Sequence, residues 1–283
     1  MHINYPKEIQ TNTYGRISLA ILLLLLLTAV FANFISPYGP FEYSEGALSP
    51  PSLAHLLGTN DVGQDIFSRL IFGARNSLLV AFLVGLFSTL LGLLAGSVAA
   101  LAGGSVDMVI MRIVDAFLAI PAIVIIILVS AYVQPSVVTL IVILSLLTWQ
   151  GSARILRAQT LSLKQRLDIL SARTFGAGTF YILRKRIVPD LTPVMLACFI
   201  ANARRAVFLE AGLAFLGITD PSAISWGAII HHALNFTHLP VWKWWLLPVG
   251  FALSLTIIAF TFLGHALEEA MNPRLRRNSN AYN

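Results

Sequence analysis

Six apolar runs of membrane-spanning length constrain the fold of this chain more than any other feature of its sequence. They cover residues 17–35, 78–102, 108–133, 137–153, 192–217 and 245–267. A helix needs about 20 consecutive apolar residues to cross roughly 30 Å of hydrocarbon, and each run reaches or nearly reaches that length. Because 57% of the residues are hydrophobic and only 11% are charged, an ordinary soluble domain is excluded. We predict an all-α, polytopic membrane protein with six transmembrane helices.

The apolar runs divide the chain into five parts. These are an N-terminal tail (1–16), a first transmembrane helix (17–35), an extracytoplasmic segment (36–77), a five-helix core (78–267) that includes a polar loop (154–190), and a C-terminal tail (268–283). The first run is rich in leucine and is not followed by a small-residue cleavage site. We therefore expect it to remain as a membrane span rather than to be removed as a signal peptide.

Lysine and arginine are divided unevenly between the two sides of the membrane. If the N-terminus is cytoplasmic, the outer segments hold three of them, Arg69, Arg75 and Lys243, against fourteen inside. The fourteen are Lys7, Arg16, Arg112, Arg154, Arg157, Lys164, Arg166, Arg173, Arg184, Lys185, Arg186, Arg274, Arg276 and Arg277. By the positive-inside rule, both termini face the cytoplasm. This asymmetry also explains the pI of 9.8 without a nucleic-acid partner.

The loop 154–190 is the one long basic segment between the apolar runs, and small residues, a glycine and a proline punctuate it. We expect two short helices joined by a turn at Gly176, with Pro189 as a stop. The residues expected to face a partner protein are Ser171, Ala172, Arg173, Gly176 and Pro189.

Charged residues inside the apolar runs are the best candidates for transport. Each costs roughly 2.5 to 3.5 kcal/mol at the centre of a membrane helix on insertion scales, so it must face protein or water. Arg204, Arg205 and Glu210 lie in the fifth run, and Asp115 lies in the third, three residues after Arg112. We expect Arg112 and Asp115 to pair locally, and Glu210 to brace the helix or gate.

Arg204 and Arg205 point about 100° apart on a helix, so one neighbour cannot neutralise both. Two interpretations are open. At least one arginine lines a translocation path and attracts an anionic group, such as the carboxylate of a peptide or chelator, or both form salt bridges with a partner subunit.

The sequence carries few signs of other chemistry. It has no HExxH, GxSxG or GxxxxGK[ST] motif, so we expect neither catalysis nor ATP binding in this chain. Its single cysteine, Cys198, cannot form a disulfide within the chain. His231, His232 and His238 are weak candidates for a metal site, because no cysteine or carboxylate supports them. The nearby Trp242, Trp244 and Trp245 are typical of an interfacial belt.

Gly92 and Gly96 begin a stripe of small residues on the second run, which continues through Ala99 or Ala100 to Gly103. Such a stripe lets another helix approach closely. The partner helix can belong to this subunit or to a second one.

Several stretches resemble the permeases of ABC importers for oligopeptides, dipeptides and nickel. They are GTNDVGQDIFSRLIFGAR at residues 58–75, MRIVDAFLAIP at 111–121, LEAGLAFLG at 209–217, SWG at 225–227 and LGHALEEAMNPRL at 263–275. Within 154–190, Ala172, Gly176 and Pro189 agree with the family's cytoplasmic coupling loop. Asn60, Gln64, Leu170, Ser171 and His265 depart from the family pattern. The resemblance extends over residues 37–274.

The resemblance implies a type I ABC importer permease fold in the bacterial inner membrane. It implies a second, homologous permease, two cytoplasmic ATPase subunits that bind ATP and Mg²⁺, and an extracytoplasmic binding protein that delivers a small peptide or a nickel or metal chelate. No cofactor is expected in this chain. An exporter of the same fold is an alternative, as is a channel or secondary transporter, although no inverted repeat is visible.

Overall fold

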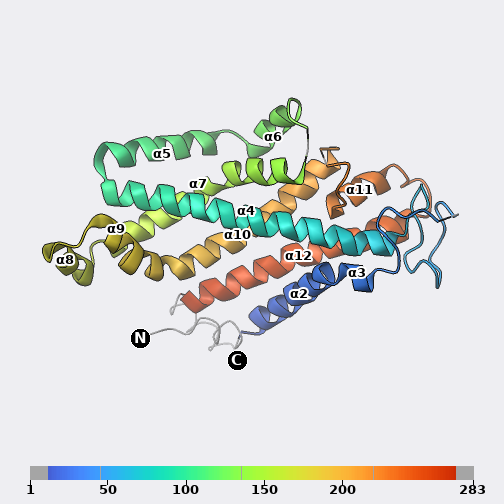
Figure 1. Cartoon of the computed structure of the whole chain (residues 1–283), viewed down its shortest axis with the longest axis horizontal. Helices are drawn as coiled ribbons and strands as arrows, with labels where there is room; N and C mark the ends of the chain where they lie inside the picture. Colours follow the sequence, from blue (N-terminus) through green and yellow to red (C-terminus); the bar gives the residue numbers. More distant parts are fainter. Residues whose placement is uncertain (1–11, 45, 135, 219, 272–283) are drawn as a thin grey trace.

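The long helices of this protein lie side by side as a bundle in the computed structural model (Figure 1). The structure describes residues 12–44, 46–134, 136–218 and 220–271. The predicted inner cations Lys7, Arg274, Arg276 and Arg277 lie outside these residues. The elements are α2 (Thr13–Val30), α3 (Ala32–Ile35), α4 (Ile66–Ala102), α5 (Gly104–Ala119), α6 (Ala122–Ser130), α7 (Val137–Leu163), α8 (Leu167–Thr174), α9 (Thr179–Ile182), the π-helix η1 (Leu183–Ile187), α10 (Val188–Phe215), α11 (Trp226–Leu234) and α12 (Trp242–Met271).

Each of the six predicted runs coincides with one or more of these helices. Among the described residues, α2, α4, α7 and α12 are long and apolar enough to cross a membrane on their own. The third run is broken into α5 and α6, which meet at an angle of 78° and together form a fifth candidate span. The fifth run is α10, whose 28 residues are long enough but include Arg204, Arg205 and Glu210.

The break between α5 and α6 follows from Pro121. The ring of a proline disfavours helical geometry at the residue before it, and Ile120 adopts extended angles of φ −100° and ψ 126°. A continuous third helix was therefore the wrong expectation. The chain turns sharply here, and α6 leads into the start of α7.

Helix α4 begins twelve residues earlier than the apolar run predicted. Asp65 caps it by accepting a hydrogen bond from the Ser68 amide at 2.7 Å. The preceding turn holds Gly58 and Gly63 at positive φ, where added Cβ atoms would lie 2.3 and 2.5 Å from the carbonyl oxygens of Ser49 and Ser44. The motif at 58–75 thus folds the outer segment onto the end of α4.

The stripe of small residues on α4 packs against α7 of the same chain. A Cβ added to Gly96 would lie 2.5 Å from the carbonyl oxygen of Ala153, and one added to Gly92 would lie 2.6 Å from Cβ of Ser152. Ala99 and Ala100 on the same stripe are fully buried. Close packing inside the subunit, one of the two alternatives for this stripe, is therefore what the structure contains.

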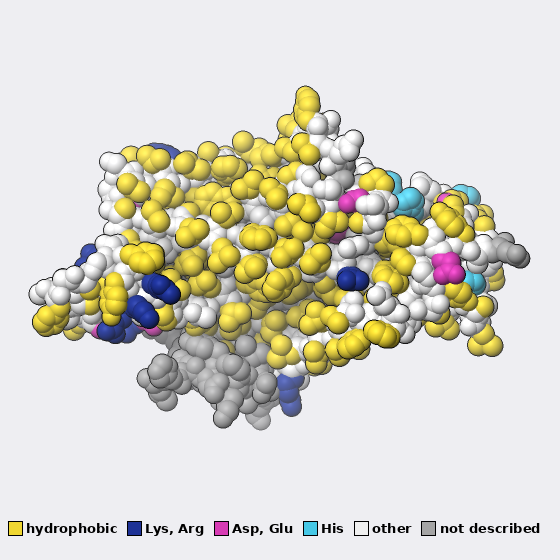
Figure 2. Space-filling model, viewed as in Figure 1, with side chains coloured by type: hydrophobic (Ala, Val, Ile, Leu, Met, Phe, Trp, Pro, Cys, Tyr) yellow, Lys and Arg dark blue, Asp and Glu magenta, His cyan; other side chains and the backbone are white. Residues whose placement is uncertain are grey.

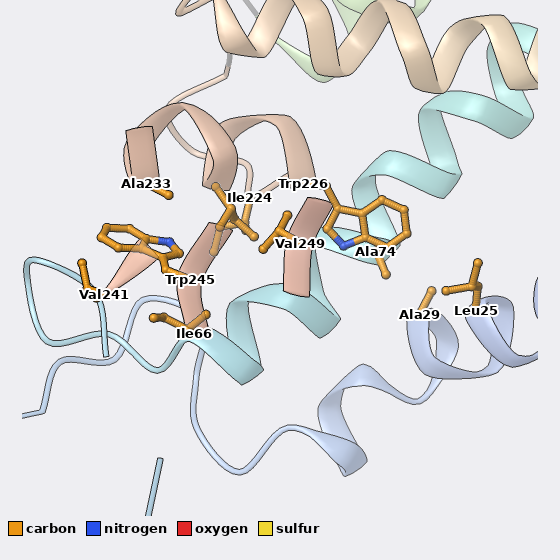
Figure 3. Packing of buried hydrophobic residues seen from close by; sticks show 11 residues of the cluster. Leu25, Ala29, Ile66, Ala74, Ile224, Trp226, Ala233, Val241, Trp245 and Val249 are labelled. Atoms are coloured by element: carbon orange, nitrogen blue, oxygen red, sulfur yellow. The ribbon is translucent and has the colours of Figure 1, made fainter. Parts of the chain in front are cut away.

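A hydrophobic cluster joins α2, α4, α11 and α12 at one end of the bundle (Figure 3). Trp226 and Trp245 are its largest members, each with 1% of its surface exposed. In Figure 3 the Trp245 ring lies among Val241, Ile66 and Ala233. The prediction of an interfacial belt is therefore wrong for Trp245, because the ring fills space between helices that only the tertiary fold brings together.

The two ends of the molecule differ in composition. Helices α8 and α9 form one end, while α11 and the segment before α4 form the other (Figure 1). Lys and Arg side chains gather toward the α8–α9 end in Figure 2, His side chains appear at the opposite end, and hydrophobic side chains cover much of the face between them. Asn12, which caps α2, donates to Glu269 of α12 at 2.6 Å, so the outermost described turns of these helices lie together.

The α4–α7 contact leads to a stability prediction. Gly96→Val should lower the free energy of unfolding by about 1–3 kcal/mol, because the added side chain overlaps the backbone of α7. The measurement is thermal unfolding of purified protein in detergent. Gly250→Val in α12 is the matched control, because a Cβ there meets nothing within 4 Å. Equal melting temperatures for the two variants would contradict this account of the contact.

Candidate functional site

The loop between α7 and α10 forms a compact cap at one end of the molecule. Helix α8 ends at Thr174, and Gly176 then adopts φ +83°, in the left-handed region that favours glycine. The chain resumes helical structure at Thr179. This confirms the predicted short helix and the turn at Gly176, whereas the second helix runs on through η1 into α10 without a gap.

Pro189 does not end a helix, contrary to the expectation from the sequence. It lies in the first turn of α10, which follows α9 and η1 with little interruption. Proline fits there because the first amides of a helix have no intrahelical acceptor and its fixed φ suits helical geometry. The glycine turn, rather than the proline, separates the two short helices.

Some side chains of this cap are buried against neighbouring helices, and others are exposed. Ile169 of α8 is 1% exposed and packs in a cluster with Leu156, Ile182 and Leu191. Arg166 bridges Asp168 at 3.2 Å and Asp190 at 2.6 Å, which ties the start of α8 to α10. In contrast, Leu167, Phe175 and Phe180 are 81%, 89% and 72% exposed. Exposed apolar side chains on an anchored support are typical of a protein-binding surface.

The exposed residues of the cap include most of those predicted to face a partner. Ser171, Arg173 and Gly176 are exposed, Ala172 is half-buried and Pro189 is exposed on the neighbouring turn. We call residues 167–180 the loop cap.

A groove of about 560 Å³ opens between α7, α10 and α12. Its polar side chains come from Thr148, Ser152, Asn202, Arg204, Arg205 and Thr261. Its apolar side chains include Ile155, Phe208 and Ile257. The volume falls in the range of 300–1,000 Å³ that small-molecule sites occupy, so the groove is large enough for a small solute.

Both adjacent arginines line this groove. Arg204 donates a hydrogen bond to the Thr261 hydroxyl of α12 at 3.3 Å. The ion pairs formed by the described residues include neither Arg204 nor Arg205. The two positive charges of the groove therefore form no ion pair within the described residues, although Arg204 also lines an adjoining hollow with Glu268.

The floor of the groove is a hydrogen-bonded network across three helices. The buried Asn202 of α10 donates to Ser152 of α7 at 2.9 Å and to Thr89 of α4 at 3.2 Å. Sequence reasoning missed Asn202 and Thr261, because uncharged polar residues are common in membrane helices and only the packing shows which of them converge.

Asp115 and Glu210 lie away from this groove. Asp115 pairs with Arg154 of α7 rather than with Arg112, so the expected local pair is wrong. The reason is that α7 runs alongside α5 and brings Arg154 next to Asp115. It also brings Arg157 next to Asp107, with two contacts of 2.5 Å. These two ion pairs join α5 to α7.

Glu210 is buried where α10 meets α4 and α11. It accepts a hydrogen bond from the Ser77 hydroxyl at 3.4 Å, and that hydroxyl in turn accepts one from the Trp226 amide at 3.2 Å. Only 3% of Glu210 is exposed. It borders a small hollow of about 40 Å³ that Asn76, Ser136 and Asp220 also line. This position suits a brace between helices.

The rings of His231 and His232 lie edge to face with centroids 5.9 Å apart, and each of the other two contacts of these histidines is with a non-ligand group. His231 Nδ1 contacts the Phe215 carbonyl oxygen at 2.9 Å, and the ring of His238 stacks on Phe236. Within the described ranges, no group of three or more His, Cys, Asp or Glu residues has the arrangement of a metal site.

Asp220 links two segments at the small hollow beside Glu210. It accepts hydrogen bonds from the Ser222 hydroxyl at 2.6 Å, from the Ser222 amide at 2.9 Å and from the Val137 amide at the start of α7 at 3.2 Å. The Ser222 hydroxyl, followed by these amides, holds the pKa of Asp220 below its ordinary value. The carboxylate thereby ties the segment after α10 to the N-terminus of α7.

Comparison with known proteins shows which family has this architecture. Residues 88–277 match the family described as "Binding-protein-dependent transport system inner membrane component", and residues 10–51 match the N-terminal transmembrane domain of oligopeptide transport permease C. The dipeptide transport system permease protein DppC of Bacillus subtilis is 36% identical over 274 residues, which cover 96% of this chain and 85% of that protein. The oligopeptide transport system permease protein OppC of the same organism is 34% identical, with coverage of 95% and 88%.

A solved structure shares the fold. A chain from inward-facing conformations of the MetNI methionine ABC transporter superimposes with a TM-score of 0.52, covering 71% of this chain and 97% of that one. The two sequences are 19% identical, so the likeness concerns the fold alone. It agrees with the importer permease fold expected from the sequence.

Asp220 leads to a pH prediction. A carboxyl whose folded pKa is depressed stabilises the protein above its unfolded pKa of about 3.9, and this contribution disappears as pH falls through the folded pKa. Asp220→Asn should therefore lower the melting temperature at pH 7, and the difference from wild type should shrink toward pH 3. Thermal unfolding in detergent across this range tests it. A difference that stays constant with pH would contradict the assignment.

Proposed function

This chain belongs to the family of binding-protein-dependent transport system inner membrane components, and from that premise we propose that it is the permease subunit of an ATP-driven importer of small peptides. Its similarity to a dipeptide and an oligopeptide permease over nearly its whole length carries this proposal. The substrate named for those relatives is a peptide, and the groove has a suitable volume for one.

The translocation path is shared with a second, homologous permease. The groove of this chain is open on one side, and its arginines have no acidic partner among the described residues. A second subunit facing α7, α10 and α12 would close it. In this arrangement Arg204 and Arg205 line the path, whereas Glu210 and Asp115 hold the surrounding helices in place.

Two separate ATPase subunits lie beneath the pair of permeases and supply ATP hydrolysis with Mg²⁺, and one of them binds the loop cap. The exposed Leu167, Phe175 and Phe180 provide the apolar contact, and the Arg166 ion pairs transmit movement of α8 to α10. In this proposal the loop cap and both termini face the cytoplasm. The opposite end, with α11 and the turn at 58–65, then receives the extracytoplasmic binding protein.

Peptide is the preferred cargo over nickel or a metal chelate. The peptide permeases supply the positive argument. The histidines that would favour a metal are engaged separately, with His231 on a backbone oxygen and His238 on an aromatic ring.

The assembly can be tested by purifying the complex from native membranes through a tag on this chain. We expect mass spectrometry to identify a second permease and two ATPase chains, since the groove and the loop cap each leave a contact surface open. Recovery of this chain alone after gentle extraction would favour a channel or secondary transporter instead.

The turn at Gly176 provides a test of coupling. Gly176→Val should uncouple ATP hydrolysis from uptake, because a β-branched residue is strained at φ +83° and would displace α8. Gly176→Asn is the matched control, since asparagine adopts this conformation more readily. The measurements are uptake and ATPase activity of the complex in proteoliposomes. If the valine variant retained normal uptake and normal ATPase stimulation, the coupling role of this turn would be wrong.

A further inference from the structure

The two arginines of the groove indicate which chemical class of solute the path accepts. We propose that Arg204 and Arg205 together bind the free C-terminal carboxylate of a peptide, so that this subunit itself selects carboxylate-bearing cargo. The inference rests on the proposed function and specifies its substrate.

The position of the arginines is the first argument. Arg204 is the seventeenth of the 28 residues of α10, so the pair lies near the middle of that helix. Although consecutive side chains on a helix diverge by about 100°, both line the same groove, because it spans the width from α7 to α12. Cations gathered in a groove between helices attract an anion more strongly than cations on an open surface, because the low-dielectric walls focus their field.

The chemistry of the groove is the second argument. A guanidinium presents a planar fork of N–H donors that matches the two oxygens of a carboxylate. Arg204 is already oriented by its hydrogen bond to Thr261. Asn202 donates to Ser152 and both are uncharged, so they offer a polar floor without a competing charge. The walls formed by Ile155, Phe208 and Ile257 can accommodate peptide side chains with little selectivity.

The phosphate of a lipid headgroup is the other oxyanion that this pair could bind. The middle of α10 is distant from both ends of the helix, where headgroups lie, and this favours a solute carboxylate. The experiment below separates the two sources.

The preference of the groove for anions over cations can be measured with a single introduced thiol. Ala201 lines the groove one turn before the arginines, and Cys198 is the one cysteine of the chain. In the assembled complex carrying Cys198→Ala and Ala201→Cys, labelling rates of this chain are compared for an anionic and a cationic methanethiosulfonate. We expect the anionic-to-cationic rate ratio to fall about fivefold or more when Arg204→Gln and Arg205→Gln are added.

Arg112→Gln is the matched control for this measurement. Arg112 is an exposed cation on α5 that does not line the groove, so its replacement should leave the rate ratio unchanged. An unchanged ratio after the removal of Arg204 and Arg205 would overturn the inference.

Protection of the same thiol identifies the bound anion. A pool of random tripeptides with free C-termini should slow labelling at least twofold, and the same pool with amidated C-termini should not. This difference should disappear in the double arginine variant. Equal protection by both pools would overturn the inference, as would protection that depends on anionic lipid in the nanodisc and not on peptide.

Uptake by the complete transporter separates this inference from the proposed function. The complete transporter could take up the free-carboxylate pool while that pool protects the thiol no better than the amidated pool does. This result would overturn the carboxylate site and leave the peptide importer intact. Absence of uptake for both pools would overturn both. Failure of the double arginine variant to co-purify with the second permease would place the arginines in the subunit contact and overturn the inference.

Discussion

The close approach of α4 to α7 is the contact on which the rest of the bundle depends. Gly92 and Gly96 remove the side chains that would separate the two backbones, and Ser152 and Ala153 occupy the space. In a membrane, association of helices depends on such packing and on hydrogen bonds, because lipid chains are as apolar as the helices themselves. With this pair fixed, α10 packs across both, and Asn202 can reach Ser152 and Thr89 at once.

Charge is arranged around this apolar framework in two ways. Asp107 and Asp115 are neutralised by Arg157 and Arg154, so α5 is held to α7 by ion pairs. Arg204 and Arg205 have no such partner among the described residues and face a groove instead. The contrast separates cations that stabilise the fold from those available to a ligand or a second subunit.

The loop cap connects this framework to the proposed energy source. Ile169 anchors α8 in the cluster below it, while Phe175 and Phe180 remain exposed. Because Arg166 contacts both Asp168 and Asp190, a displacement of α8 would act directly on the first turn of α10. Helix α10 also carries the groove arginines, so one helix joins the loop cap to the groove.

The sequence by itself determined the membrane class, the positions of the apolar runs, the glycine turn at 176 and the family, because hydropathy, glycine conformation and ordered motifs are local properties. Tertiary structure decided the rest. It paired Asp115 with Arg154 instead of Arg112, buried Trp245, and placed Pro189 at the start of a helix. It also brought both arginines into one groove with Thr261. These outcomes depend on which helices become neighbours, and that is set by packing between residues far apart in the chain.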